Sequence, residues 1–300
     1  MPKVGSKNSY PKSLKSYVNN YNNAVEMMTL DFGDTRRFGG RGRQSTQISS
    51  IIMDYLPYTI LLFTTAAILY SSLAIIVGLK VAQNVGSRMD KAITLIGATF
   101  SSVPIWWAGM MFLLIFFVGL EWYPRPSPAF PRIQNVGYLA YLKELLIKMS
   151  LPLITIVLFK FGGRLYISRN IVASILEDDY IMAARAKGIP EKKVIYGHAL
   201  KTAAPPMVTT ATLAIITSFA GGLITEVIFS WPGIGYLLQH ALYESLPTEP
   251  SIAVFEDGLI AGITFVLVIL SVVGLYISDI ICGILDPRIE IGYDFKKEVK

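Results

Sequence analysis

The chain has 300 residues, of which 53% are hydrophobic and 16% charged, and its mean hydropathy of +0.50 indicates a membrane protein rather than an ordinary soluble domain. A single cysteine, Cys282, excludes a disulfide framework within the chain, and two histidines are too few for a histidine metal cluster. The net charge of +6 does not indicate nucleic-acid binding, because the Lys and Arg residues lie between and beside hydrophobic runs, where they suit anionic headgroups.

Residues 1–50 form a polar N-terminal segment that is rich in Asn, Ser, Lys and Gly. It lacks the apolar core of a signal peptide, so we expect internal spans to direct insertion into the membrane.

Five hydrophobic runs follow, at 51–79, 92–120, 149–170, 203–229 and 259–285. A helix needs about 20 apolar residues to cross the hydrocarbon core of a bilayer, and each run meets or approaches that length. The third is the weakest, because Lys160 and Arg164 interrupt it on one helical face. Backbone polar groups must be satisfied within lipid, and the runs are too long for barrel strands. The sequence therefore predicts an all-α membrane protein, a helix bundle with its transmembrane domain over 51–285.

The basic residues between the spans predict the orientation. Fifteen Lys and Arg residues lie in 80–91, in 160–201 and in the tail over 286–300, whereas 121–148 has four and 231–252 has none. The positive-inside rule places the first set, including the tail, in the cytoplasm. Five spans then leave the N-terminal segment outside the cytoplasm, although it carries eight basic residues. This conflict favours a longer natural chain with a preceding span.

A polar stretch, DDYIMAARAKGIPEKKVIYGHALKTAAPP, begins at Asp178 between the third and fourth spans. Acidic residues suit a helix start, Gly188 suits a helix end, and Pro190 suits the first turn of a second helix. We expect two helices hinged at Gly188, within a cytoplasmic loop at about 171–202. Small residues at the hinge would let another protein approach the backbone. A solvated loop that serves only topology and a helix on the membrane surface remain alternatives.

This stretch resembles the cytoplasmic EAA loop of ABC-importer permeases, in the form typical of the dipeptide, oligopeptide and nickel family. EVIFSWPGIGYLL at 226–238 and LDPRI at 285–289 are similar to two further signatures of that family. The resemblance covers about 30–289. It implies the type I importer permease fold, and it also implies that the first span of the family is missing from this sequence.

The resemblance implies that the loop is a coupling helix that docks into a groove on a cytoplasmic ATPase. The residues that match or flank its signature, and are expected to couple, are Asp179, Tyr180, Ala183, Ala184, Arg185, Lys187 and Gly188. Met182 stands where the broader signature has a glutamate, so Asp179 or Glu191 is expected to supply a charge to the partner.

The implied partners are a second homologous permease subunit, two cytoplasmic ATP-binding subunits and an extracytoplasmic solute-binding protein, with the chain itself a multi-pass protein of the cell membrane. The sequence contains no GxxxxGK[ST] loop. We therefore expect no catalytic residue, metal or cofactor on this chain, and ATP and Mg on the ATP-binding subunits. The implied solutes are oligopeptides or related molecules such as oligosaccharides or nickel chelates.

Two further groups of residues are candidates for function. In the fourth span, small and weakly polar residues share a narrow arc and predict either a solute path or close helix packing: Thr210, Ala214, Thr217, Gly221 and Thr225. After that span, a proline and two glycines predict a sharp turn at the outer surface. Its expected role is an outer gate or a surface for the solute-binding protein, formed by Glu226, Trp231, Pro232 and Gly233.

Two other functional classes compete with a permease subunit. An ion-coupled secondary transporter would be expected to show inverted repeats and broken or charged helices at the bilayer midplane, which we do not find in the sequence. An intramembrane enzyme would require reactive groups that meet, yet Glu226 and Asp279 are predicted at opposite membrane faces.

Overall fold

The computed structural model describes residues 34–35, 46–130, 137–243, 245–246, 249–253 and 257–285, together with Phe32. The predicted polar N-terminal segment lies mostly outside these residues, and the predicted tail over 286–300 lies wholly outside them.

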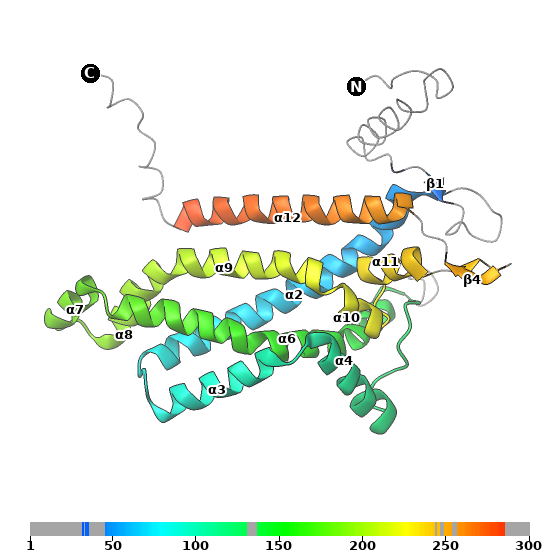
Figure 1. Cartoon of the computed structure of the whole chain (residues 1–300). Helices are drawn as coiled ribbons and strands as arrows, with labels where there is room; N and C mark the ends of the chain where they lie inside the picture. Colours follow the sequence, from blue (N-terminus) through cyan, green and yellow to red (C-terminus); the bar gives the residue numbers. More distant parts are fainter. Residues whose placement is uncertain are drawn as a thin grey trace, which may run out of the picture.

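Helices make up most of the described chain (Figure 1). In order they are α2 (Ile48–Ala82), α3 (Arg88–Ser102), α4 (Ile105–Leu113), η1 (Leu114–Gly119), α6 (Tyr138–Leu176), α7 (Asp179–Ala186), α8 (Glu191–Lys193), η2 (Val194–Ala199), α9 (Leu200–Gly221), α10 (Leu223–Ile228), α11 (Ile234–Tyr243) and α12 (Asp257–Leu285). The two η segments are short stretches of π-helix. The predicted all-α bundle is confirmed.

Two short antiparallel hairpins lie at the end of the bundle where α11 ends (Figure 1). One pairs β1 (Asp34–Thr35) with β2 (Thr46–Gln47), and the other pairs β3 (Ser245–Leu246) with β4 (Glu249–Ala253). Asp34 lies opposite Gln47, and Ser245 lies opposite Ala253. No pattern in the sequence predicted these hairpins, and they are too short to change the fold class.

Among the described residues, four helices are long and apolar enough to cross a membrane, and a fifth crossing exists if α3 and the helix after it form one bent span. The predicted spans correspond to α2, this bent pair, α6, the continuous helix from α8 to α9, and α12. Figure 1 shows α2, α6, α9 and α12 running side by side.

The second span is not the single continuous run that the sequence indicated. Its two halves meet at an angle of 86° between Ser102 and Ile105. Pro104 explains the break, because proline has no N–H to continue the helix and disfavours helical geometry in the residue before it. Val103 accordingly has extended backbone, with φ −82° and ψ 127°.

The fourth span begins earlier and ends earlier than predicted. It runs from Glu191 without a break, and α9 ends at Gly221. A Cβ at Gly222 would lie 2.1 Å from the ring of Phe63 on α2, so glycine is required for this close approach. After it, α10 starts as a separate helix that carries Thr225 and Glu226.

Two contacts join α3 closely to α6. A Cβ at Gly162 would lie 2.1 Å from the carbonyl oxygen of Gly97, so the helix backbones cross where neither residue has a side chain. The first turn of α3 is held to α6 by an ion pair. Arg169 Nη2 and Nε on α6 donate to the Asp90 carboxylate on α3 at 2.7 and 3.0 Å. Asp90 also accepts from the backbone N–H of Gly86 at 2.8 Å.

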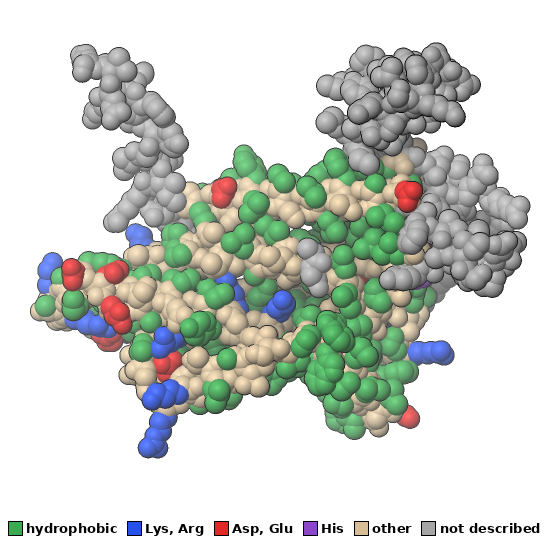
Figure 2. Space-filling model, in the orientation of Figure 1, with side chains coloured by type: hydrophobic (Ala, Val, Ile, Leu, Met, Phe, Trp, Pro, Cys, Tyr) green, Lys and Arg blue, Asp and Glu red, His purple; other side chains and the backbone are tan. Residues whose placement is uncertain are grey.

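Charged side chains gather at the end of the bundle that carries α7, while the rest of the visible face is mainly hydrophobic or uncharged (Figure 2). Large apolar side chains are exposed along the helices, among them Leu95, Val118, Val272 and Tyr276. This distribution is what a bilayer around the bundle requires, and it agrees with the predicted cytoplasmic position of the α7 end.

Candidate functional site

The third and fourth spans are joined by a compact elbow, which we define as residues 177–193: α7 is its first arm, Gly188 lies at the turn, and α8 is its second arm. Its helix α7 begins with Asp179 in the first turn and ends with Arg185 in the last turn, so both charges complement the helix dipole. Gly188 then takes φ +77°, and its N–H donates to the Arg185 carbonyl at 2.9 Å. Glycine adopts this left-handed conformation without strain, which explains the hinge that the sequence predicted.

The elbow is shorter than the predicted loop at about 171–202, because α6 extends to Leu176 and α8 begins at Glu191. Pro190 is the residue that precedes α8. From Glu191 the helix continues through η2 into α9 as one membrane-spanning element. The second arm of the elbow is therefore a rigid extension of the fourth span.

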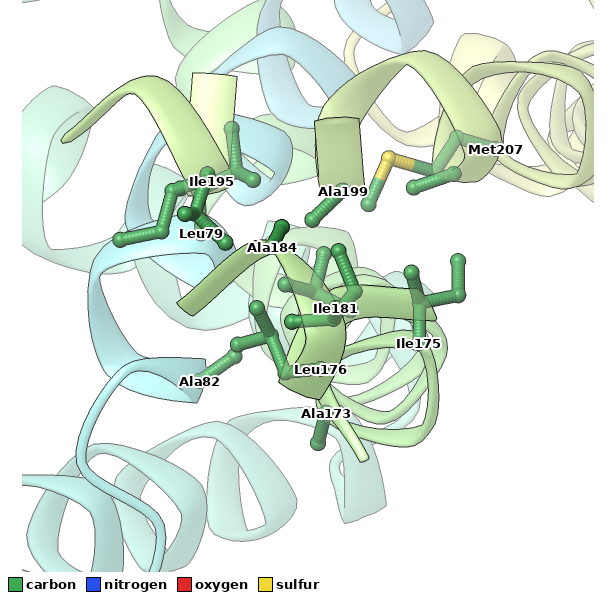
Figure 3. Packing of buried hydrophobic residues seen from close by; sticks show 13 residues of the cluster. Leu79, Ala82, Ala173, Ile175, Leu176, Ile181, Ala184, Ile195, Ala199 and Met207 are labelled. Atoms are coloured by element: carbon green, nitrogen blue, oxygen red, sulfur yellow. The ribbon is translucent and has the colours of Figure 1, made fainter. Parts of the chain in front are cut away.

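The inner face of α7 is fixed to its own chain. Ile181 is 0% exposed and Ala184 is 8% exposed. Figure 3 shows both side chains in a cluster with residues from α2, α6, η2 and α9. The cluster comprises Leu79, Ala82, Val172, Ala173, Ile175, Leu176, Ile181, Ala184, Val194, Ile195, Ala199, Ala203 and Met207. A rigid-body displacement of α7 would therefore be transmitted to several helices at once.

This cluster changes the reading of Ala184. The sequence interpretation placed it among the small residues that a partner approaches, but the structure buries it against the spans. The sequence did contain an indication of this burial. Ala184 lies three residues after Ile181, so both side chains lie on the same helical face.

The outer face of α7 is a strip of small and apolar side chains, Met182, Ala183 and Ala186, all exposed. Met182 is 53% exposed. Asp179 and Lys187 are exposed beside the strip. Met182 and Ala186 were not among the predicted coupling residues, although both lie opposite Ile181 and Ala184 by helical spacing. We call Met182, Ala183 and Ala186 the outer strip.

Hydrogen bonds fix the remaining elbow residues. Arg185 donates to both carboxylate oxygens of Glu191, at 2.7 and 3.1 Å, across the Gly188 turn. This bond raises the pKa of Arg185 above its ordinary value. Tyr180 Oη donates to Thr202 Oγ1 on α9 at 2.9 Å. Glu191 is therefore engaged within the elbow, and Asp179 is the better candidate for a charge offered to a partner.

The predicted outer-gate residues belong to α10 and to the turn between α10 and α11, toward the opposite end of the bundle from α7 (Figure 1), and all four are buried. Glu226 is 0% exposed, and its carboxylate accepts from Thr59 Oγ1 at 2.7 Å and from the Gly235 N–H at 2.5 Å. A Cβ at Gly233 would lie 2.1 Å from the same carboxylate. Trp231 Nε1 donates to the Tyr58 carbonyl at 3.0 Å. Because these residues are buried and hydrogen-bonded, we interpret them as holding the turn against α2. Direct contact with a solute-binding protein is less favoured.

The sequence did not identify Thr59 as a member of this network. Its hydroxyl donates to Glu226 and accepts from the Ile234 N–H at 2.7 Å, so it joins α2 to α10 and α11. A threonine within an apolar run gives no signal of such a contact.

The predicted stripe of the fourth span is divided. Thr210, Ala214 and Thr217 line a cavity of about 450 Å³ in the bundle. Thr225 is buried on the separate helix α10, and nothing is described of the surroundings of Gly221 at the end of α9. The stripe therefore supports a cavity wall at 210–217 and does not continue as one surface.

The chain matches the family described as binding-protein-dependent transport system inner membrane component over residues 71–291. The chain belongs to this family. It is an ABC importer permease, a multi-pass protein of the cell membrane, and this membership decides against the ion-coupled secondary transporter.

Curated relatives and solved structures agree with this membership. The chain is 29% identical over 248 residues to the oligopeptide transport system permease protein AppB of Bacillus subtilis, which covers 83% of this chain and 74% of the relative. It is 30% identical over 251 residues to the dipeptide transport system permease protein DppB of Escherichia coli K12. That match covers 77% of this chain and 70% of the relative. A chain of the MetNI methionine ABC transporter, in an inward-facing conformation, has the same fold, with a TM-score of 0.59 and 13% identity over 79% of this chain and 97% of that chain.

Proposed function

We propose that this permease moves oligopeptides across the membrane, and that α7 is the helix through which ATP-binding subunits drive it. The observation that carries the proposal is the division of α7 into two faces. Ile181 and Ala184 are anchored in the bundle, while the outer strip of Met182, Ala183 and Ala186 is exposed at the charged end.

The outer strip suits a helix that docks into a groove of another protein. Two of its three side chains are methyl groups, which permit close approach of the backbone, and methionine adapts its shape to a partner surface. Asp179 and Lys187 flank the strip and would set the orientation of the contact.

The anchored face supports a mechanism of alternating access. The cluster around Ile181 joins α7 to α2, α6 and α9, and the second arm of the elbow continues into the fourth span. When two ATP-binding subunits close, they would pull the elbows of two permease subunits together. The attached helices would then rotate as rigid bodies between inward-open and outward-open states.

Peptides are the favoured solutes because the matching relatives are oligopeptide and dipeptide permeases. Oligosaccharides remain a second solute class from the family resemblance. The assembly in this proposal contains the chain, a second homologous permease subunit, two ATP-binding subunits that hold ATP and Mg, and a solute-binding protein. The Arg185–Glu191 salt bridge and the bend at Gly188 would maintain the conformation of the elbow when the ATP-binding subunits pull on it.

The substitution Ala183→Trp tests the docking face. In proteoliposomes that contain the whole importer and its binding protein, it is expected to lower ATP-dependent uptake about tenfold, because overpacking a close contact costs roughly 1–3 kcal/mol. Ala140→Trp is the matched control, since Ala140 is an exposed alanine at the other end of α6. Uptake at the wild-type rate in the Ala183 variant would rule out docking through the outer strip.

A further inference from the structure

The cavity of about 450 Å³ is open to the surface of the bundle, where Lys160 is exposed, and four of the membrane helices line it. Tyr70 comes from α2, Ser101 from α3, Lys160 and Arg164 from α6, and Thr210 and Thr217 from α9. Its volume is within the range of sites that hold small molecules. Figure 2 shows Lys and Arg side-chain atoms in the middle of the visible face, between α9 and α6 and apart from the charged end that carries α7.

The cavity is cationic. Lys160 and Arg164 lie one helical turn apart, and no Asp or Glu is among the described residues that line it. Lys160 forms no salt bridge with any described residue. Two positive charges on one wall with no acid opposite are suited to an anion.

Arg164 has an unused donor. The residue is 4% exposed, and its Nη2 donates to the Met207 carbonyl at 2.7 Å. Its Nε is buried without a hydrogen-bond partner among the described residues. A buried guanidinium donor without a partner is costly, so a ligand that supplies an acceptor would be bound favourably.

Neither cation is explained as an interfacial residue of the span. Lys160 lies ten residues and Arg164 six residues before the end of the predicted third span at 170, which is about 15 Å and about 9 Å along a helix. A basic side chain at such a depth is expensive in a bilayer, and residues of this kind mark solute or ion pathways.

The hydroxyl groups around the cations present acceptors and few free donors. Thr210 and Thr217 donate to backbone carbonyls of α9 at 2.8 and 2.9 Å, and Ser218 does the same at 2.7 Å. The donors left for a ligand are therefore the N–H groups of Lys160 and Arg164 and the hydroxyl of Tyr70. A carboxylate matches them, because its two oxygens accept hydrogen bonds and carry the opposite charge.

We propose that Lys160 and Arg164 bind the carboxylate of the transported solute, such as the C-terminal carboxylate of a peptide, during its passage through the bundle. This inference rests on the proposed function, since it assigns a site within that transport path. Lys160 is the adjustable contact at the cavity surface, and Arg164 is the fixed contact behind it.

The test uses two forms of one peptide, with a free or an amidated C-terminus, both shown beforehand to bind the importer's solute-binding protein. ATP-dependent uptake is measured in proteoliposomes that hold the whole importer. Lys160→Gln is expected to lower uptake of the free-acid peptide about tenfold and to leave uptake of the amide unchanged, because one charge-assisted contact is lost. Lys160→Arg is expected to retain most of the uptake. Lys80→Gln removes the same charge from an exposed position at the end of α2, outside the cavity, and is the control.

The outcomes separate the two proposals. If the wild-type importer shows no ATP-dependent peptide uptake, the proposed function fails. If wild-type uptake is normal and Lys160→Gln affects both peptides equally or neither, the carboxylate site is overturned while the function stands. If the effect of Lys160→Gln appears only in vesicles that contain phosphatidylglycerol, the cavity binds a lipid headgroup and the proposal is likewise overturned.

Discussion

Replacing Ile181 tests how firmly α7 is anchored. The side chain is 0% exposed within the cluster that joins α7 to the spans. Ile181→Ala removes three buried carbons, a loss of about 2.4 kcal/mol at roughly 0.8 kcal/mol for each carbon, and the cavity left behind raises the cost to about 3 kcal/mol. An eight-residue helix is unstable by itself, so this loss is expected to fall directly on the docking of α7.

A cost of about 3 kcal/mol corresponds to roughly a hundredfold rise in the undocked population of α7, since 1.4 kcal/mol is a factor of ten. Hydrogen exchange of the α7 amides, measured on the permease in nanodiscs before ATP-binding subunits are added, reports this population. Their exchange is expected to accelerate about a hundredfold. In the whole importer, ATP hydrolysis should continue while solute uptake falls.

The neighbouring Met182 supplies the matched control, because it is 53% exposed on the opposite face. Met182→Ala should leave amide exchange within a few-fold of the wild type and should weaken the assembly with ATP-binding subunits. Equal exchange in Ile181→Ala and the wild type would refute the anchoring of α7, and so would an equal acceleration in the two variants.

Two further sets of variants test the contacts that position the bundle. Gly233→Ala would place a methyl group 2.1 Å from the Glu226 carboxylate, so it should lower the melting temperature by an amount equivalent to about 1–3 kcal/mol. Gly283→Ala, where a Cβ meets nothing within 4 Å, should not change it, and equal melting of these two variants would contradict the close packing. Asp90→Asn should destabilise the protein by about 3 kcal/mol because it leaves Arg169 without its charge partner, and Asp90→Asn with Arg169→Gln should recover part of the loss. An unchanged melting temperature in the single Asp90 variant would show that the ion pair does not hold α3 to α6.

The positions of the spans were predictable because lipid imposes long apolar helices, and the hinge was predictable because Gly188 and Pro190 have narrow conformational preferences. Pro104 was visible within the second span, but the angle of the bend depends on how both halves pack on α6 and α10. The sequence also placed Lys160 and Arg164 on one helical face. It had no means to show that α2, α3 and α9 complete a cavity around them.

The remaining differences arise from contacts between distant parts of the chain. Glu226 was expected near the outer surface as a gate or receptor contact, and its burial depends on Thr59, which lies 167 residues earlier. The approach of Gly97 to Gly162 likewise depends on which helices become neighbours. For α7, the spacing of residues was a better guide to the buried face than the small size of the alanines. Ile181 and Ala184 lie on the same face by helical spacing, and both are buried.

Site-specific crosslinking tests the central claim about α7 most directly. In a background with Cys282→Ser, Ala183→Cys places a thiol in the outer strip, and Ala184→Cys places one on the buried face of the same helix. With a short thiol-to-amine crosslinker in the assembled importer, position 183 should link to an ATP-binding subunit, and position 184 should not. Linkage from both positions, or from position 183 to lipid alone, would contradict the assignment of α7 as the coupling helix.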